Sequence, residues 1–143
     1  MTTEDTRALV LGMLQDAGAT GDVAGAIRNL ASPGLVVHLA TGEVGGIELG
    51  SATAQELYLT VPDASLTLEG MIVENDRAAL QFHLSGTNTG PVRGYPATGK
   101  MVSIPFCLGL RVEGNAIAEI WFYLNAFAPV IPSYAESHPD EAV

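Results

Sequence analysis

Residues 77–87 read Arg-Ala-Ala-Leu-Gln-Phe-His-Leu-Ser-Gly-Thr, and they set the pattern for the second half of the chain. In the middle of this stretch apolar and polar side chains alternate, in the order Leu80, Gln81, Phe82, His83, Leu84, Ser85. Because successive side chains of a β-strand point to opposite faces, this alternation is typical of a strand with one buried face. We therefore predict a strand here, with Leu80, Phe82 and Leu84 on the core side.

The stretches on either side of residues 77–87 have the same strand character. Further strands are predicted at residues 64–74, 100–112 and 116–125. Asn75-Asp76 and Gly114-Asn115 are typical of the tight turns that join antiparallel strands, and the Gly- and Pro-rich residues 88–99 are expected to form a longer loop. The second half of the chain is therefore predicted to be an antiparallel meander.

The first half of the chain has helical patterns. Apolar spacing, capping residues and Gly or Pro breaks predict three helices: one from Thr3 or Thr6 to about Asp16, one opened by Asp22 and stopped at Ser32-Pro33-Gly34, and one opened by Ser51 or Thr53 and ended before Pro62. A short strand at residues 35–39 and a loop at residues 41–50 lie between the second and third helices. Helices followed by antiparallel strands favour an α+β fold, in which a curved sheet wraps around a helical layer.

Length and composition favour a single apolar domain. The chain has 143 residues, of which 48% are hydrophobic and only 15% charged. A chain of this length buries enough surface to fold without disulfides or a structural metal. We expect one domain over residues 1–128 and an acidic, proline-containing tail over residues 129–143. The net charge is −10 and the basic residues do not cluster, which argues against nucleic acid and anionic membranes as partners.

Targeting and cofactor signals are not found in the sequence. The acidic start and the short apolar runs predict neither a secretory signal nor a membrane span, and the single cysteine, Cys107, fits a reducing compartment. We therefore expect a cytoplasmic protein. Three dispersed histidines, without His-x-x-x-His or Cys-x-x-Cys spacing, predict no metal site. No glycine-rich phosphate-binding motif occurs, and no cofactor is expected.

Two segments carry a family resemblance. Residues 86–100 read Gly-Thr-Asn-Thr-Gly-Pro-Val-Arg-Gly-Tyr-Pro-Ala-Thr-Gly-Lys, and residues 111–121 read Arg-Val-Glu-Gly-Asn-Ala-Ile-Ala-Glu-Ile-Trp. Together they resemble the SnoaL-like polyketide cyclases of the NTF2-like superfamily. The resemblance implies a cone, in which a bent antiparallel sheet closes on the helices around one deep pocket. It also implies a homodimer that pairs through the outer sheet face, where Trp121 and Tyr123 are expected.

The departures from the family pattern bear on the chemistry. Ring-closing members carry a carboxylate in the pocket as acid/base, at the position that aligns with Phe122; a further polar position aligns with Leu108, and a histidine of the family aligns with Asn88. Phe122 cannot transfer a proton, and the residues expected to share its pocket are apolar. Tyr95 is added as a contact from the loop over the pocket mouth. The expected substrate-binding residues are Phe82, Leu84, Tyr95, Ile104, Phe106, Leu108, Ile120, Phe122 and Leu124.

We therefore expect a cofactor-independent cyclase of polyketide secondary metabolism, such as antibiotic biosynthesis, that closes a carbon ring in an apolar linear precursor. Shape templating, including (4+2)-type pericyclic closure, would supply most of the acceleration. His38 and Tyr58 are the candidate catalytic residues, since either could polarise a carbonyl. Two alternatives stay open: an acid/base cyclase, isomerase or epoxide-opening enzyme that uses His38 or His83, and a non-catalytic module that binds an apolar ligand.

Overall fold

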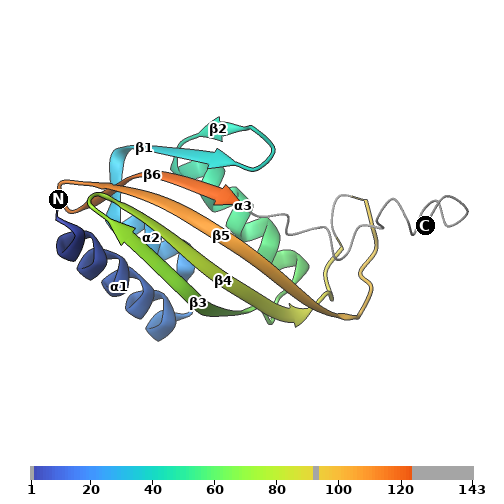
Figure 1. Cartoon of the computed structure of the whole chain (residues 1–143). Helices are drawn as coiled ribbons and strands as arrows, with labels where there is room; N and C mark the ends of the chain where they lie inside the picture. The colour runs from blue at the N-terminus through green and yellow to red at the C-terminus, as the bar shows by residue number, and fades with distance from the viewer. Residues whose placement is uncertain (1, 92–93, 124–143) are drawn as a thin grey trace, which may run out of the picture.

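The computed structural model describes residues 2–91 and 94–123, and these residues have the predicted α+β fold (Figure 1). The helices are α1 (Thr3–Thr20), α2 (Val23–Leu30) and α3 (Ile47–Thr60). The strands are β1 (Ala31–Leu39), β2 (Val44–Gly45), β3 (Ser65–Glu74), β4 (Arg77–Thr87), β5 (Met101–Glu113) and β6 (Ala116–Tyr123). The predicted tail, residues 129–143, lies outside the described residues.

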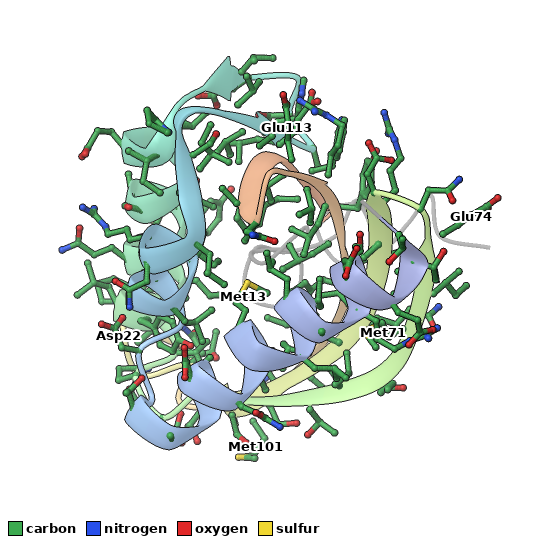
Figure 2. All side chains as sticks on the ribbon, turned by 90° about the vertical axis from the view of Figure 1, so that its left-hand side faces the viewer. Met13, Asp22, Met71, Glu74, Met101 and Glu113 are labelled. Carbon is green, nitrogen blue, oxygen red and sulfur yellow. The ribbon has the colours of Figure 1, made fainter. Side chains whose placement is uncertain are left out.

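The strands form one curved, open sheet in the order β2-β1-β6-β5-β4-β3. β3 to β6 make the predicted antiparallel meander. β1 pairs with β6 in parallel, so the expectation of a wholly antiparallel sheet is wrong for this pair. A parallel pair needs a long crossover instead of a hairpin, and here everything from β2 to β5 serves as that crossover. Figure 2 shows the sheet bending around the helices, and Met13 of α1 lies between the helices and the sheet.

The ends of α1 differ from the prediction because the chain uses other capping residues. Thr2 is the N-cap: its Oγ1 accepts from the Asp5 amide at 3.1 Å, and the Asp5 carboxylate accepts from the Thr2 amide at 3.1 Å. This reciprocal pair is a capping box, which fixes the first turn. The helix runs past Asp16 to Thr20 and ends at Gly21, whose φ of 71° is the left-handed C-cap conformation that glycine adopts readily.

The start of α3 is a second difference. The helix begins at Ile47, inside the predicted loop 41–50, and not at Ser51 or Thr53. Thr53 resembles a capping residue in sequence, but its Oγ1 donates to the Leu49 carbonyl at 2.9 Å, one turn back within the helix. A threonine that bonds in this way is inside a helix and does not cap it. The predicted loop also contains β2, which pairs with the end of β1.

The first strand is longer than predicted. β1 includes Ser32-Pro33-Gly34, which were expected only to stop α2. The pairing of β1 with β6 is irregular between Ala31 and Val36, and proline is tolerated where a sheet ladder is interrupted. The two hairpin turns lie where they were predicted, at residues 75–76 and 114–115. In the second turn Gly114 and Asn115 both have positive φ, at 57° and 65°, as a type I′ turn requires.

The core has two parts that together leave room for a site. The larger part lies between α1, α2 and the inner sheet face and includes Val10, Leu80 and Ile117. The smaller part lies under the end of α3 and consists of Leu57, Val61, Leu84, Val102 and Ile104. Within the described residues, no helix is both long and apolar enough to cross a membrane.

Candidate functional site

A cavity of about 460 Å³ lies between the helices and the inner face of the sheet. Its sheet wall carries the apolar side chains Leu35, Val37, Leu66, Leu68, Phe82, Phe106, Leu108, Ile120 and Phe122. The strand alternation explains this wall, because residues two apart along β4, β5 and β6 point to the same face. The rings of Phe82 and Phe106 stack across β4 and β5 with their centroids 5.2 Å apart.

The helical wall mixes large side chains, such as Met13, Ile27 and Leu57, with small ones that leave room beside them. It includes Ala17, Gly18, Gly21, Ala24, Gly50 and Ala54. Gly50 lets α3 approach the sheet closely: a Cβ there would lie 3.4 Å from Val37 Cγ2 and 3.9 Å from Phe122 Cε2. The glycine and alanine positions of the helical wall help to leave a hollow of the size typical of small-molecule sites.

Five of the expected substrate-binding residues line this cavity, namely Phe82, Phe106, Leu108, Ile120 and Phe122. Leu84 and Ile104 share their strand face but lie further along it, where the end of α3 covers them. Tyr95 is 41% exposed and is not among the lining residues. Leu124 lies outside the described residues.

The polar lining residues come from α3 and the start of β3, and they are Ser51, Thr53, Tyr58 and Ser65. Among the lining residues that the structure describes, Tyr58 is the only one with an ionisable side chain. Burial raises the pKa of the Tyr58 phenol above its usual value, and the negative charge of Asp22 adds to this effect. The phenol therefore stays protonated at neutral pH and can donate a hydrogen bond.

His38 lies on the opposite face of the sheet from the cavity. Its neighbours Val37 and Leu35 point inward, so His38 points outward, where it stacks on Trp121 with ring centroids 5.1 Å apart. Its Nε2 contacts Glu119 Oε2 at 2.5 Å. The hydrogen bond with His38, followed by one from Arg111, lowers the pKa of Glu119. This network ties β1, β6 and β5 together from outside.

His83 also points outward. Its Nδ1 lies 3.1 Å from Glu69 Oε1, and its Nε2 is hydrogen-bonded to Ser103 Oγ. Glu69 sits at the irregularity in the β3–β4 pairing between Leu68 and Gly70, and such bulges redirect side chains. The sheet therefore separates His83, Glu69 and Ser103 from the cavity.

A shallow depression marks the outer face near the end of β6. It encloses about 410 Å³ and is lined in part by Ile72, Arg77, Gly109, Trp121 and Tyr123. The Arg77 guanidinium carbon lies 5.3 Å from the centre of the Trp121 ring. Trp121 and Tyr123 are therefore on the outer face, as the strand alternation predicts. In the part of the chain that the structure describes, no three His, Cys, Asp or Glu side chains are grouped to hold a metal.

Sequence patterns missed several features of the cavity, among them the contact between Ser51 and Arg28. The Arg28 Nη2 donates to Ser51 Oγ at 2.7 Å, which places a guanidinium beside a lining hydroxyl. Ser51 was considered only as a helix cap. Its spacing of seven residues from Tyr58 was the available signal, because residues seven apart lie on the same helix face.

Comparison with known proteins agrees with the fold. A family model described as SnoaL-like polyketide cyclase matches residues 8–130. A presumed SnoaL-like polyketide cyclase from Jannaschia sp. CCS1 is similar in structure, with a TM-score of 0.75, 23% sequence identity, and 88% of this chain and 89% of that chain covered.

Two Streptomyces structures are also similar. AclR from Streptomyces galilaeus, a presumed hydroxylase, has a TM-score of 0.73 at 27% identity, with 90% of this chain and 93% of that chain covered. IdmH from Streptomyces antibioticus, a presumed polyketide cyclase, has a TM-score of 0.69 at 24% identity, with 87% and 93% covered. No curated protein matches the chain at a significant level.

Proposed function

Because the chain belongs to the SnoaL-like polyketide cyclase family, we propose that it closes a carbon ring in an apolar linear precursor mainly by holding that precursor in a reactive shape. The observation that carries this proposal is the lining of the cavity. In the described residues the lining contains no carboxylate and no imidazole, and the side chains of Phe122 and Leu108 are part of it. The resemblance of the sequence to the family aligns these two positions with polar ones.

The physical basis is the entropy of a flexible chain. Folding a linear precursor so that its reacting carbons meet removes internal rotations before the barrier is climbed. Well-oriented intramolecular reactions gain up to about 7–11 kcal/mol in this way. A pericyclic closure of the (4+2) type forms its bonds without a proton donor, and an apolar wall of Phe82, Phe106 and Phe122 suits such a reaction. The precursor would belong to polyketide secondary metabolism.

Tyr58 is the group proposed to assist. Its neutral phenol can donate a hydrogen bond to a carbonyl of the precursor and draw electron density from the reacting double bonds. His38, the other candidate, would have to act from the outer face. The same applies to His83, so the positions of both histidines favour templating over histidine acid/base chemistry.

A second candidate function rests on the same cavity. An apolar hollow without an acid or base can hold a ligand and leave it unchanged, so a binding module is the main competitor. The experiment is to incubate the purified protein with a linear polyene that carries a conjugated diene and an activated double bond. We expect ring closure at least about a hundredfold faster than in buffer, which corresponds to about 2.7 kcal/mol of the barrier. A rate equal to that in buffer, with the polyene bound, would leave only the binding function.

A further inference from the structure

We propose that Ser51 and Arg28 form an anion subsite at the rim of the cavity, which holds a carboxylate at one end of an otherwise apolar ligand. The kind of ligand named here rests on the proposed function. The test does not, because it measures binding and not ring closure. It adds a direction to the site: one end of the ligand is anionic, and its body is apolar.

The first observation is that the cavity has a polar side and an apolar side. The strands supply hydrocarbon side chains apart from Ser65 at the start of β3, whereas Ser51 and Tyr58 both project from α3. They are seven residues apart, which places them on one helix face about 10 Å apart along the axis. A ligand that lies along α3 can therefore meet one hydroxyl near each end.

The second observation is the state of the two hydroxyls. Arg28 donates to Ser51 Oγ at 2.7 Å, so the oxygen is engaged as an acceptor and the Ser51 proton can be donated to a ligand. A carboxylate oxygen beside Ser51 would accept a hydrogen bond from the Ser51 hydroxyl and lie next to the guanidinium. Charge-assisted bonds of this kind are about twice as strong as neutral ones.

The third observation is that Arg28 has spare donors. Within residues 2–91 and 94–123, Arg7 is paired with Glu4, and Arg111 with Glu113 and Glu119. In the same ranges Arg28 has no carboxylate partner, and its hydrogen bond goes to Ser51. A guanidinium has five N–H groups, so it can hold a carboxylate while it keeps its bond to Ser51.

The other end of the polar wall disfavours an anion. Tyr58 is affected by the negative charge of Asp22, which contributes to the raised pKa of the phenol. A second negative group there would be repelled by Asp22, whereas a neutral carbonyl would accept from the phenol. The two ends of α3 therefore select different groups and fix the orientation of the ligand.

The overall charge makes this subsite easy to detect. With a net charge of −10 the protein as a whole repels anions. A preference for an anionic ligand must then come from a nearby cation. Arg28 is exposed and Ser51 is half-buried, so a carboxylate at the rim would keep part of its hydration and bind at a moderate desolvation cost.

The test uses displacement of N-phenyl-1-naphthylamine, a neutral apolar fluorescent probe, from the 143-residue chain at neutral pH and low salt. Decanoate, methyl decanoate and 1-decanol are the competitors, since they share a chain and differ in the end group. We expect decanoate to bind about tenfold more tightly than either neutral compound. The variant Arg28→Gln should reduce this ratio to about one and leave the affinity for 1-decanol unchanged, which also shows that the variant is folded.

Arg7→Gln is the matched control, because it removes an arginine of α1 that is already paired with Glu4. It should keep the tenfold ratio. Arg28→Lys keeps the charge but loses the planar fork, and it should retain only part of the preference. Equal binding of the three compounds, or a preference that survives in Arg28→Gln, would overturn the subsite and leave the templating proposal intact. Failure of all three compounds and of the probe to bind would overturn both.

Discussion

Phe122 is the residue on which templating depends most directly. The variant Phe122→Asp places a carboxylate in a wall of hydrocarbon side chains. Apolar surroundings disfavour the charged form of the new carboxyl group, and the loss of the phenyl ring leaves a gap in the cavity wall. We expect turnover of the linear polyene to fall at least about tenfold. Phe122→Leu, which keeps the wall apolar, should lose much less.

The measurement is the ring-closure rate of each variant at saturating polyene, with a thermal melt to confirm that each is folded. A Phe122→Asp variant that is as fast as the parent, or faster, would show that the cavity is suited to proton transfer after all. The templating account would then be wrong at its central residue.

Tyr58 makes a prediction about pH. The phenol is useful as a donor only while it is protonated, and burial, followed by the charge of Asp22, raises its pKa above the ordinary value of 10.0. The rate should therefore be flat from about pH 6 to about pH 9 and fall only when the pH passes the raised pKa. Tyr58→Phe should be about tenfold slower over the flat range, as expected for the loss of one hydrogen bond in the transition state.

The same pH profile separates templating from the histidine alternative. His38→Ala and His83→Ala should leave the profile unchanged, because both side chains lie on the outer face. A bend near pH 6.5, the usual histidine pKa, that disappears in one of these two variants would identify that histidine as the acid or base.

Among the elements, the loop after β4 is held to the end of α3 by one buried side chain. Asn88 is 1% exposed and uses both ends of its amide. Its Nδ2 donates to the carbonyls of Thr60, at 3.2 Å, and Gly90, at 2.8 Å. Its Oδ1 accepts from the amide and the hydroxyl of Thr98. Asn88 therefore has a structural role.

Gly90 is a second point at which this loop contacts α3, since its amide donates to the Thr60 carbonyl at 3.2 Å. A Cβ at Gly90 would lie only 1.8 Å from the Leu59 carbonyl oxygen, and that backbone atom cannot rotate away. We expect Gly90→Ala to lower the free energy of unfolding by at least about 2 kcal/mol, as overpacking does. Gly12→Ala is the control: no atom lies within 4 Å of its Cβ position, and in a helix the change should stabilise by about 0.5–1 kcal/mol. Urea denaturation measures both, and equal effects would show that the contact is loose.

The elements also show where sequence patterns are reliable. β4 was predicted to the residue because its alternation is local and uninterrupted. The start of α3 was missed because Thr53 and Glu56 have capping-box spacing, whereas Thr53 bonds back to Leu49. The parallel pairing of β1 with β6 was also missed, since it joins residues such as His38 and Trp121 that are far apart in the chain. No local pattern encodes such a contact.

At the scale of the whole molecule, the extent of the cavity is also a feature that local sequence patterns do not encode. Alternation identified which side of each strand faces inward, and so Phe106 and Ile120 were placed correctly on the sheet wall. It could not show how far along the strands the hollow extends. Leu84 and Ile104 have the same inward direction but pack under the end of α3, because helix placement in three dimensions decides which inward residues are covered.

The outer sheet face is the other property of the whole molecule, and we expect it to pair with a second copy of the chain. Tyr123 is 59% exposed and Ile72 is 72% exposed, and both border the depression beside Trp121. Exposed apolar side chains around one hollow are typical of an association surface. Trp121 is fixed between His38 and Arg77, so this surface is ordered before a partner arrives.

Tyr123→Glu tests this pairing. At a two-fold interface each change occurs twice, so one substitution places two new charges in the contact of an already acidic protein. We expect light scattering after size exclusion to give a dimer for the parent and a monomer for Tyr123→Glu at the same concentration. Leu59→Glu is the matched control, because Leu59 is 64% exposed but lies on α3, and it should stay dimeric. A monomeric parent, or equal dissociation in both variants, would remove the outer face as the interface and leave Ile72 and Tyr123 as isolated surface residues.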